Sequence, residues 1–241
     1  MPTLSISCIA TRDDDYDKAA RAIHSTVRCI GVERVYWLSD SAFPGSLAGV
    51  EVIHVRIPKV TDFCDDINRI NLRLIPRVVT TDHTLVVQPD GFAVNAEAWD
   101  PQFLEYDYVG APWPWMWGGG PYWRRPFVGN GGFSLRSQKL FRALRELEMK
   151  WGMADWAHDE RLGFREYYGL TADGVRFLPE DLLICLWYRE VLEAKWNIRF
   201  CPPELANKFS VETVHPFTQY WLGRSFGFHG VIAAPHYGVR L

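Results

Sequence analysis

The sequence lacks several features that would each define a class of protein. None of its five cysteines forms a Cys-x-x-Cys pair, and their spacing does not suit a metal site, so we expect buried thiols in a reducing compartment. No window approaches the roughly 20 apolar residues of a membrane-spanning helix. No signal peptide is visible at the N-terminus. These absences predict a cytoplasmic protein without a membrane span.

A strong charge of one sign is also absent. The chain has 26 Lys and Arg against 29 Asp and Glu, which gives a net charge of -3 and a sequence pI of about 6.2. The basic surface typical of nucleic-acid-binding proteins is therefore missing, and nucleic acid is not an expected partner. A Gly-Lys-Ser or Gly-Lys-Thr sequence is absent too, and with it the phosphate-cradling P-loop.

What the chain does have is enough apolar sequence for one large domain. Of its 241 residues 48% are hydrophobic, so a sizeable core can be buried. No internal repeat, linker or low-complexity tract divides it. We therefore expect a single domain over residues 1–241.

The first part of the chain alternates between strand and helix patterns. Strand candidates are residues 4–10, 34–38, 50–57 and 84–87, and helical spacing appears over 13–30 and over 65–79, where Pro76 is expected to interrupt the helix. This alternation predicts an α/β fold with a mostly parallel central sheet flanked by helices. Ligands bind such sheets at the carboxyl ends of the strands. Thr11, Arg12, Asp40 and Asp90 should therefore lie along one edge of one cleft.

The second part of the chain is less regular. It contains a short strand candidate at residues 106–111, helix candidates at 139–150, 156–168 and 179–192, and a Pro-broken stretch at 200–211 that we expect to be extended.

Aromatic residues make up 15% of the chain, and several crowd one segment that Pro and Gly interrupt. That segment cannot form one regular element. Two interpretations remain open, a wall on which sugars stack and a small satellite core under a long loop. The aromatic residues concerned are Trp113, Trp115, Trp117, Tyr122 and Trp123.

The stretch LVVQPDG, residues 85–91, ends a buried strand in a single carboxylate, Asp90. A turn can use Asp because its side chain bonds the local backbone. Taken alone, that interpretation is the favoured one. Alternatively, Asp90 could hold a divalent cation that neutralises a diphosphate leaving group, and Gly91 would let backbone approach closely.

Three further motifs allow two interpretations each. In GNGGFSLRS, residues 129–137, the glycines suit a turn with positive φ or the close approach of a bulky ligand. Glu180 and Asp181 open an apolar helix, where they complement the helix dipole or supply a general base. Helix N–H groups next to such a base are expected to favour its ionised form. His229 in FGFHG is either structural or a metal ligand.

In this order, QPDG, GNGGFSLRS, PEDLL and FGFHG resemble glycosyltransferases of the GT-A fold, which take sugars from nucleotide-sugar donors. With YDYVGAPW and FSVE, they resemble a bacterial group of GT-A-like glycosyltransferases of poorly defined substrate. The resemblance runs from residue 4 to residue 229. It implies a single GT-A-like, Rossmann-like domain with a nucleotide-binding half at 1–91 and an acceptor-binding, catalytic half at 92–241.

The resemblance also implies roles for individual residues. Asp90 and His229 match a site for Mn²⁺ or Mg²⁺, although Gln88 replaces the first acid of the usual Asp-any-Asp motif. Asp181, with Glu180, matches the base of inverting relatives. Donor contacts are expected at Thr11, Arg12, Asp40, Arg69, Asn71, Arg73, Gln88 and Gly91. Acceptor or sugar contacts are expected at Trp113, Trp115, Asn130, Gly131, Gly132 and Arg136.

The function predicted from the sequence is therefore metal-dependent, inverting glycosyl transfer from a nucleotide sugar, carrying UDP, GDP or another nucleotide, to a glycan or small-molecule acceptor. A retaining enzyme stays possible. Two other classes are kept as alternatives. One is a non-catalytic nucleotide- or carbohydrate-binding module on a degenerate GT-A scaffold, which the missing first acid favours. The other is a metal-dependent phosphoesterase that uses the same carboxylates.

Overall fold

The computed structural model describes residues 2–12, 15–61, 63–113, 127–150 and 178–241. Within them, a six-stranded sheet runs in the order β3-β2-β1-β4-β9-β6. Its strands are β1 (Leu4–Ile9), β2 (Arg34–Ser39), β3 (Glu51–Arg56), β4 (His83–Val87), β6 (Tyr108–Gly110) and β9 (Ser134–Ser137). The first four are parallel, whereas β9 runs antiparallel to both neighbours, β4 and β6. The predicted α/β fold with a mostly parallel central sheet is confirmed.

The two central strands are buried because helices cover the sheet. Every residue of β4 is buried, as are the first five of β1, as expected for parallel strands covered on both faces. Their serine and threonine hydroxyls have internal partners. The hydroxyls of Ser7 and Thr84 lie 3.0 Å apart, and those of Ser5 and Thr81 2.7 Å apart.

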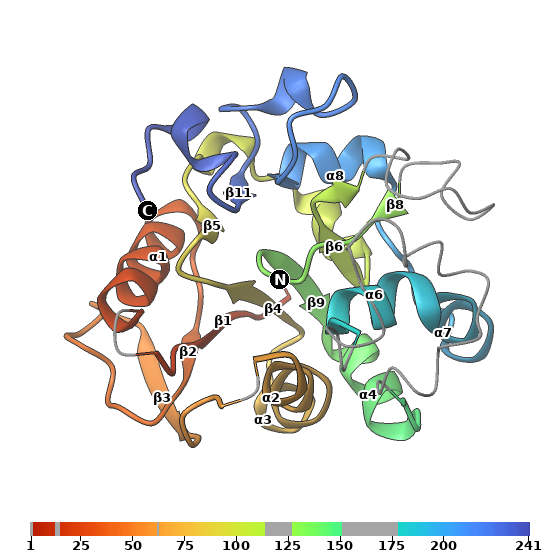
Figure 1. Ribbon diagram of the computed structural model, residues 1–241, viewed down its shortest axis with the longest axis horizontal. Coiled ribbons are helices and arrows are strands. Elements are labelled where there is room, and N and C mark those ends of the chain that lie inside the picture. The colour runs from red at the N-terminus through yellow and green to blue at the C-terminus, as the bar shows by residue number, and fades with distance from the viewer. Residues whose placement is uncertain (1, 13–14, 62, 114–126, 151–177) are drawn as a thin grey trace.

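Helices surround the sheet on different sides (Figure 1). The first, α1 (Tyr16–Cys29), packs against β5 (Gly91–Ala93), and α4 (Gln138–Glu146) packs against α3 (Ile75–Val78). The other helices in the described ranges are α2 (Phe63–Arg69), α6 (Glu180–Leu182), α7 (Arg189–Trp196) and α8 (Pro203–Phe209), with π-helical segments η1 (Ile70–Leu74) and η6 (Leu183–Trp187). Short 3-10 turns are η2 (Ala96–Ala98), η3 (Pro101–Glu105), η7 (Gln219–Trp221) and η8 (Ala234–Tyr237). No helix in the described ranges has the length and apolar character needed to cross a bilayer.

The helix over residues 65–79 is not interrupted at Pro76, contrary to the prediction from the sequence. It continues through α2, η1 and α3, and Pro76 lies in the first turn of α3. The N–H of Ile75 bonds the carbonyl of Ile70, five residues back. This wider π turn lies where the proline ring would otherwise meet the carbonyl of Leu72, so the chain accommodates the proline without ending the helix.

The prediction of an extended stretch over residues 200–211 was wrong. Residues Pro203–Phe209 form α8, and Pro203 occupies its first turn. Proline is favoured there because its fixed φ suits the helix and its missing N–H would have no intrahelical partner. The helix predicted at 139–150 ends earlier, at Glu146. The helix predicted at 156–168 lies outside the described residues.

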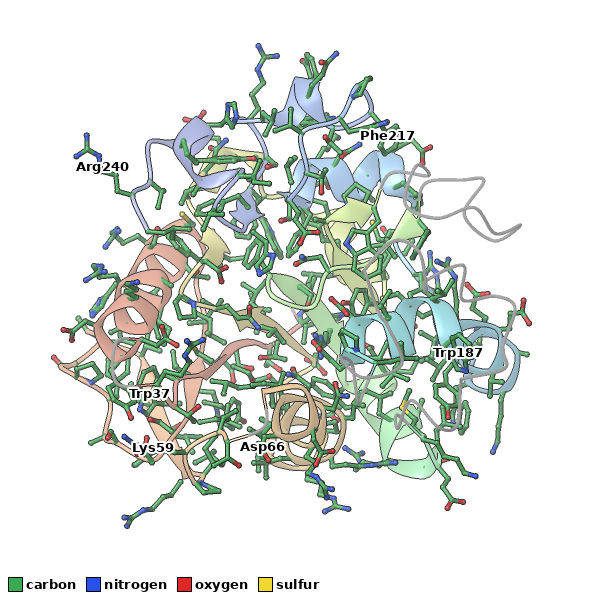
Figure 2. All side chains as sticks on the ribbon, viewed as in Figure 1. Trp37, Lys59, Asp66, Trp187, Phe217 and Arg240 are labelled. Atoms are coloured by element: carbon green, nitrogen blue, oxygen red, sulfur yellow. The ribbon has the colours of Figure 1, made fainter. Side chains whose placement is uncertain are left out.

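A smaller sheet joins the end of the chain to the middle. It contains β10 (Ser210–Val211), β11 (Gly227–His229) and β5 in the order β10-β11-β5. Aromatic rings fill the space beneath it, and Phe133 stacks on Phe209 with ring centroids 4.8 Å apart. Strands β7 (Pro112–Trp113) and β8 (Phe127–Val128) form a separate pair. Figure 2 shows Trp37 inside the fold and Arg240 projecting from its rim.

Candidate functional site

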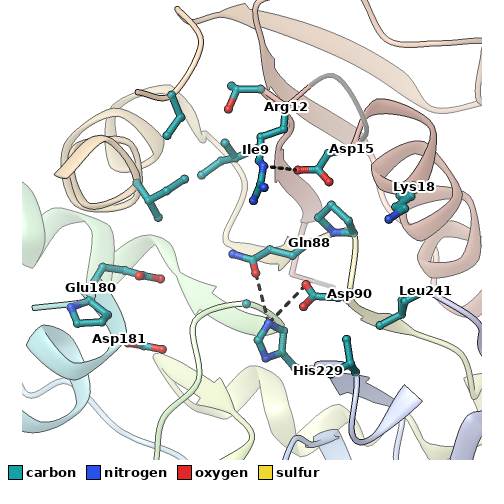
Figure 3. Close-up of a pocket in the computed structure, with 17 residues that line it drawn as sticks. Ile9, Arg12, Asp15, Lys18, Gln88, Asp90, Glu180, Asp181, His229 and Leu241 are labelled. Atoms are coloured by element: carbon teal, nitrogen blue, oxygen red, sulfur yellow. Dashed lines mark hydrogen bonds and ion pairs between the residues drawn. The ribbon is translucent and has the colours of Figure 1, made fainter. Parts of the chain in front are cut away.

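A pocket of about 510 Å³ opens at the carboxyl ends of β1 and β4 (Figure 3). Because β9 runs antiparallel to β4, the glycine-rich loop before it reaches the same edge of the sheet. The residues that line the pocket are Ile9, Thr11, Arg12, Asp15, Lys18, Val60, Ile67, Gln88, Pro89, Asp90, Gly132, Pro179, Glu180, Asp181, His229, Val231 and Leu241.

Asp90 lies at the tip of a tight turn after β4. The backbone groups of Gln88 and Gly91 bond each other across this turn, at 2.9 and 3.1 Å. Strand β11 pairs with β5 so that His229 stands opposite Gly91, which brings the histidine beside the turn. Its Nε2 lies 3.7 Å from Asp90 Oδ1 and 3.3 Å from Gln88 Oε1.

The other ring nitrogen of His229 faces two side chains. Its Nδ1 lies 2.8 Å from the Asn130 amide nitrogen and 3.2 Å from Glu212 Oε1. Burial lowers the pKa of His229, but the hydrogen bond and charge of Glu212, with the charges of Asp90 and Asp181, outweigh it and raise the pKa overall. No role was assigned to Glu212 from the sequence, although it belongs to the FSVE motif.

The glycines around this histidine leave room for side chains. A Cβ on Gly132 would stand 2.1 Å from His229 Nε2, and one on Gly91 would stand 2.5 Å from its Cδ2. A Cβ on Gly131 would stand 2.0 Å from Glu180 Oε1. The positive φ anticipated for this turn falls on Asn130, at 53°. Close approach, rather than a left-handed backbone, therefore explains Gly131 and Gly132.

Asp181 belongs to the start of α6, away from the Asp90 turn (Figure 3). Its carboxylate accepts hydrogen bonds from the N–H of Gly131 at 2.9 Å and of Leu182 at 2.8 Å. Burial, followed by the charge of Glu180, nevertheless raises the pKa of Asp181 to about 7. The neighbouring N–H groups do lower the pKa of Asp181, as expected, but burial and the charge of Glu180 raise it by more. The expected net shift toward the ionised form is therefore wrong.

Glu180 pairs with Arg136 inside the protein. The guanidinium Nη2 lies 3.0 Å from Glu180 Oε1, and the Arg136 side chain is 0% exposed. Arg136 also donates to Ser134 Oγ, to the Gly131 carbonyl and to Asn71 Oδ1. Arg136 and Asn71, predicted to contact acceptor and donor, are instead buried in the network that holds Glu180 and the glycine loop.

Two further arginines predicted to contact the donor point elsewhere. Arg69 bonds Asp65 at 2.8 Å, and its side chain is 65% exposed. Arg73 donates to the carbonyls of Leu144 and Leu147, and so ties η1 to the end of α4. Neither side chain lines the pocket.

Asp40 and Trp113 also lie outside the pocket lining. Asp40 accepts a hydrogen bond from the Tyr16 hydroxyl at 2.7 Å and so ties β2 to α1. Trp113 is buried, and its indole N–H donates to Glu212 Oε2 at 2.9 Å. The other aromatic residues of its segment, Trp115, Trp117, Tyr122 and Trp123, lie outside the described residues.

The end of the pocket beside β1 combines charged and apolar groups. Thr11 is buried, whereas the Arg12 side chain is 63% exposed and lies 3.8 Å from Asp15. Lys18, on the first turn of α1, lines the same end and was not recognised in the sequence. An apolar wall there is formed by Ile9, Val60 and Ile67.

The chemistry of the groups beside Asp90 fits a divalent cation only in part. The described residues contain no group of three or more His, Cys, Asp or Glu side chains that could hold a metal ion. A carboxylate, an imidazole nitrogen and an amide oxygen do converge there. Such a set suits Mn²⁺ or Mg²⁺ if a phosphate-bearing ligand supplies the remaining oxygens.

Comparison with known proteins identifies the family. The model of a family described as "Protein of unknown function (DUF5672)" matches residues 70–229, and the chain belongs to that family. No curated protein matches the chain. Among solved structures, the chain is similar to the "crystal structure of a glycosyltransferase involved in the glycosylation of the major capsid of PBCV-1". Sequence identity is 10% and the TM-score 0.48, over 95% of this chain and 93% of that one.

Proposed function

We propose that the protein transfers a sugar from a nucleoside-diphosphate donor to an acceptor hydroxyl with inversion at the anomeric carbon. The observation that carries the proposal is that one pocket brings two kinds of group together. Asp90 and His229 lie beside each other, and Asp181, with a pKa of about 7, comes from a different element. Glycosyl transfer needs these two functions together, one for the leaving diphosphate and one for the attacking hydroxyl. The order of the sequence motifs agrees with this function.

Asp90 and His229 would hold Mn²⁺ or Mg²⁺, with Gln88 contributing its amide oxygen. A bound divalent cation supplies Lewis-acid stabilisation of the negative charge on the departing diphosphate. Arg12 and Lys18 line the other end of the pocket and would attract the donor phosphates. The apolar wall at that end suits the flat face of a nucleoside.

Asp181 would act as the general base. Its carboxylate removes the proton from the acceptor hydroxyl while the hydroxyl oxygen attacks the anomeric carbon. The bond from that carbon to the diphosphate breaks, and the nucleoside diphosphate leaves with the electron pair. A base with a pKa near the working pH combines adequate ionisation with a real affinity for the proton. The Gly131 N–H fixes the orientation of the carboxylate.

The proposal is tested by replacing Asp181 with Asn, which keeps the shape of the side chain and removes its basicity. Turnover should fall by about 100- to 10,000-fold, the usual contribution of a general base, while binding of the nucleoside diphosphate with Mn²⁺ stays unchanged. Turnover is measured as nucleoside diphosphate released from a panel of nucleotide sugars and glycoside acceptors. Binding is measured by calorimetry.

Asp100→Asn is the matched control. The Asp100 carboxylate accepts the N–H of Gln102 at the start of η3, and Asp100 lies outside the pocket lining. An Asp181→Asn variant with undiminished turnover would contradict the assignment of the base. Nucleotide binding without diphosphate release from any donor and acceptor would instead identify a binding module. Release of inorganic phosphate would indicate a phosphoesterase. The anomeric configuration of the product distinguishes inversion from retention.

A further inference from the structure

The Nδ1 atom of His229 faces two groups that make opposite demands on it. The amide of Asn130 is oriented, because its Oδ1 accepts from the N–H of Phe133 at 3.2 Å, so its NH₂ group faces the histidine. That NH₂ group can only donate, whereas the carboxylate of Glu212 can only accept. A neutral imidazole carries one proton, so its Nδ1 cannot satisfy Asn130 and Glu212 at the same time.

The choice at Nδ1 decides what Nε2 can do. When Nδ1 accepts from Asn130, the proton is on Nε2 and points to the acceptors Gln88 and Asp90. When Nδ1 donates to Glu212, Nε2 presents a lone pair to the same position. Only the second tautomer can bind a cation there, because a metal-binding imidazole nitrogen must be unprotonated.

We propose that Glu212 is a positioning residue that selects the cation-binding tautomer of His229, in competition with Asn130. This inference rests on the proposed function only where that function makes Asp90 and His229 the cation site. Glu212 does not itself line the pocket but contacts His229, which does, so it acts through the imidazole.

Trp113 holds Glu212 in place for this task. Its indole N–H donates to Oε2 at 2.9 Å, while Oε1 faces His229 at 3.2 Å. The two carboxylate oxygens thus serve two donors at once. An amide cannot do the same, because one of its ends is an NH₂ group. Glu212→Gln therefore either loses the indole bond or donates to Nδ1, as Asn130 does.

The test is the tautomer of His229 in the metal-free full-length protein, read from its ¹⁵N chemical shifts at a pH where the ring is neutral. Glu212→Gln should increase the Nε2–H tautomer. Asn130→Gly, which tolerates the positive φ at this position, should increase the Nδ1–H tautomer. Glu204→Gln is the control, because Glu204 is an exposed glutamate on α8 outside the pocket lining.

The second measurement is Mn²⁺ affinity, by calorimetry and electron paramagnetic resonance, alone and with UDP or GDP. Glu212→Gln should weaken Mn²⁺ binding by about 10- to 100-fold, as loss of a group that orients a metal-binding histidine does. Asn130→Gly should not weaken it. The proposal is supported if the two variants shift the tautomer of His229 in opposite directions and only Glu212→Gln weakens Mn²⁺ binding. Tautomers unchanged, or shifted in the same direction by both variants, overturn it, as does wild-type protein that binds no Mn²⁺ under any of these conditions.

Neither measurement depends on sugar transfer, so the two proposals can fail separately. Protein that shows the expected tautomers and Mn²⁺ affinities but releases no diphosphate from any donor would refute the proposed function alone. The inference alone would be refuted if the wild-type protein transfers sugar and the tautomer of His229 is the same in the wild-type protein and in Glu212→Gln. Should Glu212→Gln fold poorly, Trp113→Phe keeps an aromatic ring at this buried position, removes the indole donor to Glu212, and should shift the tautomer in the same direction by a smaller amount.

Discussion

Asp181 and Glu180 are adjacent in sequence but carry their charges in different surroundings. Glu180 faces the guanidinium of Arg136 at 3.0 Å in the interior, which satisfies its negative charge locally. Among the residues that the structure describes, no cation pairs with Asp181, and burial together with the charge of Glu180 raises its pKa to about 7. The neighbour that looks redundant in the sequence therefore adds, after burial, to the proton affinity of the proposed base.

Replacing Glu180 with Gln should lower the pKa of Asp181, because it removes a like charge that disfavours ionisation. The acidic limb of the pH–rate profile then moves to lower pH. At pH 6, a carboxyl group with a pKa of about 7 is roughly one-tenth ionised, so turnover relative to the plateau can rise by up to about tenfold. The measurement is the pH dependence of turnover.

The same substitution leaves Arg136 buried without its carboxylate, so the free energy of unfolding should fall by about 3–5 kcal/mol. Rates are therefore compared at a temperature where the variant is folded, with Glu204→Gln as the control. An acidic limb that stays in place, or moves to higher pH, would show that Glu180 does not set the pKa of Asp181.

At the level of single residues, the types of residue and the order of the motifs predicted much of the pocket lining. They did not predict the residues that lie behind the lining and contact it. Asp90, His229 and Asp181 stood out by their tight or strand-end positions, and the resemblance of the ordered motifs to GT-A glycosyltransferases supplied the roles predicted for them. Arg136 was misassigned because a long cationic side chain is usually exposed, and burial beside a carboxylate is invisible in the sequence. Glu212 was missed because its two partners are brought to it only by folding.

Among the elements, α4 depends on a single residue at its start. Ser137 accepts the N–H of Leu140 at 3.0 Å and donates its own proton to Asp107 Oδ1 at 2.6 Å. It therefore caps the helix and also satisfies a buried carboxylate. Asp107 in turn receives the N–H of Arg199 at 2.8 Å, so the cap joins α4 to the segment that follows α7.

Ser137→Ala should lower the free energy of unfolding by about 1–3 kcal/mol, since it removes a helix cap and one donor to a buried acid. Urea unfolding followed by circular dichroism measures this loss. Donor binding should stay unchanged, because Ser137 lies outside the pocket lining. Ser46→Ala, in an exposed loop, is the control, and an equal loss in both variants would contradict the cap assignment.

Two of the errors at the level of elements concern proline. Pro203 lies in the first turn of α8, where proline is tolerated, and Pro76 is accommodated by the π turn that precedes it in a continuous helix, whereas the sequence pattern suggested a break at each. The π-helical segments η1 and η6 were not predicted either, since the extra residue in a turn depends on packing rather than on apolar spacing. The strand and helix order over the first 91 residues was predicted because buried parallel strands and amphipathic helices leave strong local patterns.

For the molecule as a whole, ligand binding should appear as thermal stabilisation. At a nucleoside diphosphate and Mn²⁺ concentration near 100 times the dissociation constant, the native state gains about 2.7 kcal/mol. For a chain of this size that corresponds to a rise of roughly 5–10 °C in Tm. Asp90→Ala should abolish the Mn²⁺-dependent part and leave the basal Tm nearly unchanged, because the Asp90 side chain is 41% exposed.

Asp100→Asn serves again as the control in this thermal-shift experiment. A Mn²⁺-dependent stabilisation that survives Asp90→Ala would show that the cation binds elsewhere. A nucleotide effect that needs no metal would agree with a binding module, and in that case the turnover assay decides.

The arrangement of the whole sheet was predictable only in part. Alternating elements predicted its parallel strands, but nothing local in the sequence indicates that β9 inserts antiparallel between β4 and β6. The same holds for the pairing of β11 with β5, which sets His229 opposite Gly91. Both pairings join segments far apart in the chain, and such contacts follow from the total burial of the fold rather than from any short pattern.

The insertion of β9 beside β4 has a consequence for synthesis on the ribosome. Strand β4 is synthesised well before residues 134–137, so its edge that pairs with β9 stays unpaired until β9 has left the ribosome. An unpaired strand edge, here in a strand that ends in the apolar residues Leu85, Val86 and Val87, is prone to pair with another chain. The nascent protein is therefore most exposed to aggregation, and most in need of a chaperone, during the interval between these two strands.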